Sequence, residues 1–88
     1  MKITIGNKTK VHLLISIDGQ NAGVLAQGDK IEERLNELIA SHLDIDRDTL
    51  EFSEEEVTLL SYSSTKTVSI TYGDGDQSTL DIEPIHVY

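Results

Sequence analysis

The chain has 88 residues, and its 16 acidic against 7 basic side chains give a formal net charge of −9. This length predicts a single domain. The absence of cysteine excludes a disulfide scaffold, a thiolate zinc site and a cysteine nucleophile.

The first third of the sequence predicts β-structure. Ile3 alternates with Ile5, and Val11, Leu13, Ile15 and Ile17 recur at every second position on one face, as the apolar residues of half-buried strands do. Asp18-Gly19 is a strong hairpin signal, because a type I′ turn needs positive φ at both central positions. A returning strand through residues 24 and 25 completes the hairpin, although Gly23 weakens its strand pattern.

One amphipathic helix is predicted next. Its apolar residues recur at helical spacing and form a single stripe, namely Ile31, Leu35, Leu38, Ile39 and Leu43. Asp29 is expected to be the N-cap, with Glu32 closing a capping box. The helix should end near Leu43 or Asp44.

Residues 54–62 have two interpretations. Ser53 with Glu56 fits a capping box, and Phe52 with Val57 fits a hydrophobic staple, which together indicate a short helix. The β-rich residues that follow indicate a strand. We favour the strand and keep the short helix as the alternative.

The last third predicts two further strands. Residues 68–72 alternate, residues 73–76 form a Gly/Asp turn, and residues 80–82 return the chain. Pro84 lacks an amide donor, so the last strand should lie at an edge or break there. The expected fold is α+β: a small antiparallel sheet, made of the N-terminal hairpin and a C-terminal meander, with the helix packed on one face.

One stretch partly matches a calcium-binding loop. Asp44, Asp46, Asp48 and Glu55 occupy positions 1, 3, 5 and 12 of an EF-hand pattern. Thr49 stands where that loop needs glycine for its sharp bend, so we interpret the stretch as an acidic connection and expect no metal site.

The other chemically active residues do not form a recognisable centre. His12, His42 and His86 lie on separate predicted elements, and Asp74 with Asp76 is typical of a turn. Nucleophile elbows and phosphate-binding glycine loops are absent. We therefore expect no enzymatic activity and no cofactor.

The negative charge is concentrated in residues 29–56, which hold eleven acidic and three basic side chains. We expect an acidic partner-binding surface there, comprising Glu33, Glu37, Asp44, Asp46, Asp48, Glu51, Glu54, Glu55 and Glu56. Direct binding to nucleic acid is disfavoured, because phosphate contacts require Lys and Arg. Anionic membrane surfaces also recruit basic segments, and the sequence lacks both a signal peptide and a membrane-spanning stretch, so we expect a cytoplasmic protein.

In size, acidity, lack of cysteine and predicted single helix over a small sheet, the chain resembles phage-encoded DNA-mimic inhibitors. The resemblance covers mainly residues 29–56 and implies an inhibitor that acts in takeover of the host. It would bind a basic DNA-binding protein, such as a nucleoid-associated protein or a defence nuclease, and compete with DNA. Two alternatives remain: an immunity or antitoxin-type protein that neutralises a partner enzyme, and a non-catalytic structural or adaptor module.

A homodimer is also expected. The run from residue 61 to residue 72 has Lys66 as its single charged residue, and an uncharged strand edge invites pairing with a second copy.

Overall fold

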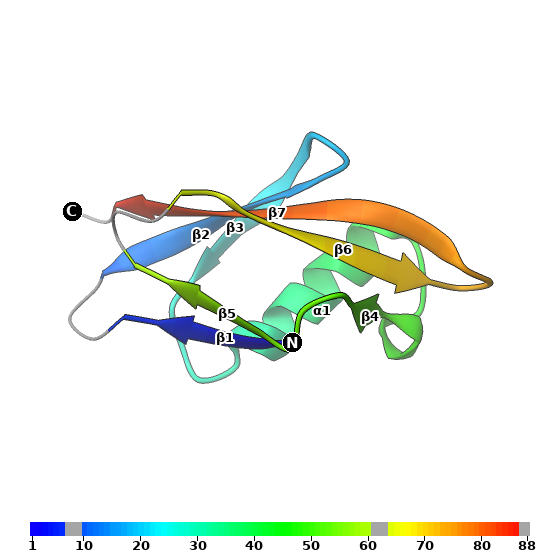
Figure 1. The fold of residues 1–88 in the computed structure, drawn as a ribbon, viewed down its shortest axis with the longest axis horizontal. Helices are drawn as coiled ribbons and strands as arrows, with labels where there is room; N and C mark the ends of the chain where they lie inside the picture. Colours follow the sequence, from blue (N-terminus) through cyan, green and yellow to red (C-terminus); the bar gives the residue numbers. More distant parts are fainter. Residues whose placement is uncertain (7–9, 61–63, 87–88) are drawn as a thin grey trace.

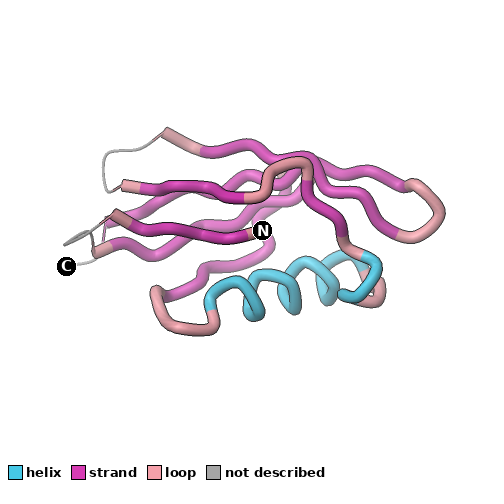
Figure 2. Tube along the Cα trace, turned by 60° about the horizontal axis from the view of Figure 1, so that its bottom comes forward, coloured by secondary structure: helices cyan, strands magenta, loops and turns pink. Residues whose placement is uncertain are grey.

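The computed structural model of the chain describes residues 1–6, 10–60 and 64–86. Its elements in chain order are β1 (Lys2–Ile5), β2 (Val11–Ile17), β3 (Gln20–Ala26), α1 (Ile31–Leu43), the 3-10 helix η1 (Arg47–Thr49), β4 (Glu51–Phe52), β5 (Glu56–Leu59), β6 (Lys66–Tyr72) and β7 (Asp76–His86). The larger sheet is antiparallel with strand order β3-β2-β7-β6-β4, and β1 and β5 form a small parallel sheet. Helix α1 lies on one side of the strands (Figures 1 and 2). The expected α+β class is therefore confirmed.

The β2–β3 hairpin turns at Asp18 and Gly19, as expected, with φ of 52° and 81°. The turn is also tied to β7. The Asp18 N–H donates to the Thr79 carbonyl at 2.9 Å, and the Thr79 N–H donates to Asp18 Oδ1 at 2.9 Å. The two hairpins of the sheet are thus joined through adjacent strands β2 and β7.

The core lies between the larger sheet, the small sheet and α1. Strand β2 buries every second residue from Val11 to Ile17, which is the alternation that the sequence shows. Helix α1 contributes Ile31, Leu35 and Ile39 as buried residues. The helical apolar stripe is therefore confirmed as the packing face.

The helix begins differently from the prediction. Lys30, not Asp29, is the N-cap residue, and no side chain caps the helix. Glu32 does not close a capping box, because its Oε1 accepts a hydrogen bond of 3.2 Å from the Ile3 N–H of β1. At the other end Asp44 is the C-cap in a left-handed conformation, so the predicted end is confirmed. Within the described residues, no helix combines the length and apolar character needed to cross a bilayer.

Residues 56–59 form strand β5, so the strand interpretation is confirmed and the short helix is wrong; residues 61 and 62 lie outside the described part. Strand β5 does not join the antiparallel meander. It pairs in parallel with β1, where Ile3 lies opposite Val57. The small sheet thus joins two segments more than 50 positions apart.

The prediction that the strand holding Pro84 lies at a sheet edge or breaks there is wrong for the strand as a whole. Strand β7 lies between β2 and β6 and continues to His86. The register with β6 ends at Lys66 opposite Ile82, so β7 extends past its neighbour. Because Thr79 bonds towards β2, alternation turns the Pro84 nitrogen to the other side, where the missing donor breaks no registered pair.

Candidate acidic interface

All nine carboxylates predicted for the partner-binding surface belong to exposed residues. We call this set the acidic band. Its members follow the chain from the outer face of α1, through the helix C-cap and η1, to β4 and the start of β5: Glu33, Glu37, Asp44, Asp46, Asp48, Glu51, Glu54, Glu55 and Glu56. This stretch follows α1 to its C-terminal end and then turns back through β4 towards the start of β5 (Figures 1 and 2).

Arg47 holds the two helix carboxylates of the band. Its Nη1 donates to Glu37 Oε1 at 2.9 Å and lies 4.0 Å from Glu33 Oε1. The helical spacing of the two carboxylates predicts their proximity, but η1 supplies a cation that the sequence does not place there. These side chains are about half exposed, so the pairs contribute at most about 1 kcal/mol to stability.

Asp46 has a structural task within the band. Its Oδ1 accepts a 3.0 Å hydrogen bond from the Asp48 N–H and caps η1. The Thr49 hydroxyl donates to the Asp46 carbonyl at 2.7 Å and closes the same turn. The Asp46 carboxylate is therefore already engaged in a hydrogen bond with the backbone.

Most of the band carries no countercharge. Glu56 lies 3.7 Å from the Lys2 ammonium, and Glu33 and Glu37 share Arg47. The other six acidic residues form no ion pair with any described basic residue. The band is thus a largely uncompensated anionic surface that a cationic partner can contact without first breaking ion pairs.

Arg34 packs differently from what its place in the helical pattern indicates. The helical pattern puts it on the solvated face with Glu33 and Glu37, yet it is half-buried. Its Nη2 donates to the Ala26 carbonyl at 2.7 Å, which fixes the chain between β3 and α1. A shallow hollow of about 590 Å³ lies here, lined by Arg34, Glu33 and Glu37 among others. A tertiary contact to a backbone carbonyl leaves no sequence signal.

The three histidines lie on separate elements. His12 lies on β2, His42 in the last turn of α1 and His86 at the end of β7. Asp74 is in the turn between β6 and β7, and Asp76 begins β7. In the described part of the chain, no three His, Cys, Asp or Glu side chains are grouped as metal ligands would be.

Comparison with known proteins supplies no relative. No protein-family model matches the chain, and the searches of curated proteins and of solved structures found no match either. The functional interpretation therefore depends on the physical properties of the acidic band.

Proposed function

We propose that this protein is a DNA-mimic inhibitor, which binds a basic DNA-binding protein through the acidic band and competes with DNA for the same groove. The observation that supports the proposal is that all nine band residues are exposed and six of them are without a described countercharge. A nucleoid-associated protein or a defence nuclease would supply the complementary Lys and Arg side chains.

The spacing of the carboxylates suits such a groove. Glu33 and Glu37, which share Arg47 as an exposed countercharge, are one helical turn apart, which corresponds to a rise of about 6 Å. Phosphates follow each other at about 3.4 Å along one DNA strand, so the helix presents roughly one carboxylate for every second phosphate. The fold fixes the backbone positions from which the carboxylates project, and binding through them should be steered by charge and weakened by salt.

A competition assay tests the proposal. A fluorescent duplex is bound to a panel of basic proteins: an HU-type nucleoid protein, a uracil-DNA glycosylase, a restriction enzyme and a CRISPR effector. The unlabelled acidic protein is then added while anisotropy is followed. We expect stoichiometric displacement of DNA from at least one of them. Failure to displace DNA from any panel member would contradict the proposal for these classes of partner.

Two matched variants separate the effect of the acidic band on binding from the effect of net charge. The first neutralises band residues whose side chains make no described hydrogen bond or ion pair, as Glu51→Gln, Glu54→Gln and Glu55→Gln. The control neutralises three exposed acids outside residues 29–56, as Asp74→Asn, Asp76→Asn and Glu83→Gln. Both change the net charge from −9 to −6.

The band variant should weaken displacement by about tenfold or more, which corresponds to about 1.4 kcal/mol. The control variant should lose much less of its ability to displace DNA, because distant charges are screened over roughly 8–10 Å. Equal losses would mean that net charge alone acts. Binding to the partner without displacement of DNA would instead favour an immunity-type protein.

A further inference from the structure

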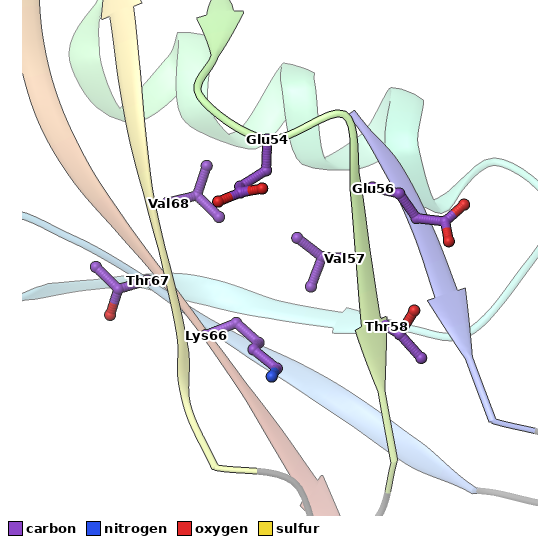
Figure 3. A pocket seen from close by; sticks show the side chains of 7 residues that line it. All are labelled: Glu54, Glu56, Val57, Thr58, Lys66, Thr67 and Val68. Atoms are coloured by element: carbon purple, nitrogen blue, oxygen red, sulfur yellow. The ribbon is translucent and has the colours of Figure 1, made fainter.

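Strands β5 and β6 face each other across a groove where the small and large sheets diverge. The groove encloses about 270 Å³ between residues 54–58 and residues 66–68. Figure 3 shows the side chains of Glu54, Val57 and Lys66 reaching into the space between the two strands. This volume lies below the roughly 300–1,000 Å³ of small-molecule pockets, so the groove is small for a ligand of that class.

The β6 edge of the groove has an unpaired backbone. Strand β4 pairs with β6 only at Glu51 and Phe52, and Ser53 adds the last contacts. The Ser53 N–H donates to the Ser69 carbonyl at 2.9 Å, and the Ser69 N–H donates to Ser53 Oγ at 3.0 Å. Ser69 therefore bonds towards this edge, and by the two-residue alternation of a strand Thr67 does so as well. No described strand pairs with Thr67 on that side.

The β5 edge is equally open. The Glu55 carbonyl accepts from the Lys2 N–H at 2.8 Å, and the Leu59 carbonyl accepts from the Gly6 N–H at 2.8 Å. These bonds direct the odd-numbered residues of the segment towards β1. Alternation then turns the N–H and C=O groups of Glu56 and Thr58 away from β1, into the groove. The backbone of Thr67 on one side and of Glu56 and Thr58 on the other thus flank the same space.

The side chains of the groove also suit a strand. Val57 and Val68 are 6% and 2% exposed and form an apolar floor, whereas Glu56, Thr58 and Thr67 are exposed at the rim. A strand placed here would present alternate side chains to the floor and to solvent. At the rim, Glu54 and Lys66 reach into the groove, whereas the Glu56 carboxylate turns towards β1, where it lies 3.7 Å from the Lys2 ammonium (Figure 3).

We propose that this groove binds an extended segment of a partner protein, added as a β-strand between β5 and β6. The segment has small apolar side chains facing the valine floor and a basic side chain facing the Glu54 carboxylate. Its backbone joins the five-stranded and two-stranded sheets into one, which is the strand-addition mode of peptide recognition. The inference does not depend on competition with DNA, because its hydrogen bonds come from strand edges rather than from the carboxylates.

Model peptides test the groove directly. The probe is a fluorescent hexapeptide that alternates lysine and valine, followed by anisotropy against the whole protein. The key comparison uses two versions of this peptide that are N-methylated at either the odd or the even residues. We expect both to bind about tenfold more weakly or worse, because the two sets of N–H groups would face β5 and β6.

A protein variant supplies the matching control. Thr58→Pro removes the N–H that faces the groove and leaves the bonds between β5 and β1, whereas Thr58→Ala removes only the side chain. The proline variant should weaken peptide binding about tenfold and the alanine variant less than about twofold. If the proline variant fails to fold, the methylated peptides still decide the matter.

Equal binding of the methylated and unmethylated peptides would overturn the inference and assign the attraction to the acidic band. Absence of binding by the parent peptide at about 1 mM would overturn it too. A dissociation constant of that size corresponds to a binding free energy of only about 4 kcal/mol. Neither result would affect the DNA competition, so the two proposals can fail separately.

Discussion

Substitution of Gly23 by alanine should destabilise the fold through the backbone. Gly23 has a φ of +149°, which L-residues rarely adopt. It lies opposite Ile15 beside a register shift in the β2–β3 pair, where Ser16 is opposite Asn21. Ala22 is therefore the extra residue of a β-bulge, and glycine permits the backbone to follow it.

The expected cost has two parts. Backbone strain at a disfavoured φ amounts to about 1–3 kcal/mol. A Cβ at position 23 would also lie 3.2 Å from Leu38 Cδ1 and 3.4 Å from Cδ2, and this flexible side chain of α1 can move at a smaller cost. We expect a total loss of about 2 kcal/mol, which lowers the melting temperature of a domain this size by roughly 8–16 °C.

Urea unfolding followed by circular dichroism measures the loss. A second measurement in a Leu38→Ala background removes the contact and leaves the strain. In that background Gly23→Ala should still cost about 1 kcal/mol or more. A change in the free energy of unfolding below about 0.5 kcal/mol in the wild-type background would refute the strain. Complete rescue by Leu38→Ala would instead assign the loss to the contact.

Three further predictions concern charge and assembly. The backbone hydrogen bond from Thr79, helped by Ser78, lowers the pKa of Asp18 below its ordinary value of 3.8. Its charge should therefore stabilise the fold above that pH and cease to do so as pH falls through the lowered pKa. Asp18→Asn should lower the urea midpoint at pH 7 but not in strong acid. An equal loss at both pH values would contradict this prediction. Arg47→Ala should lower the free energy of unfolding by less than about 1 kcal/mol, and about 1 M salt should remove this effect. A salt-independent loss measured by urea unfolding would exclude an ionic origin. Sedimentation should find a homodimer, and a 9.7 kDa species at high micromolar concentration would contradict that expectation.

The local sequence pattern was sufficient to predict the elements whose determinants are close together in the sequence. The alternation of Val11 to Ile17 and the Asp18-Gly19 turn predict the N-terminal hairpin, because strand periodicity and turn geometry are set within a few residues. The α1 stripe and its end near Asp44 follow for the same reason. The exposure of the acidic band was also predictable, because unpaired carboxylates are rarely buried.

Tertiary structure decided which partner each of these groups meets. Glu32 bonds to Ile3 instead of the helix terminus, and Arg47 neutralises part of the band because η1 folds back onto α1. The parallel pairing of β1 with β5 creates the groove beside β6. Composition and periodicity record which face of an element is apolar. They do not record which distant backbone edge, carbonyl or charge will lie within hydrogen-bonding distance, because that choice is made by packing the whole chain at once.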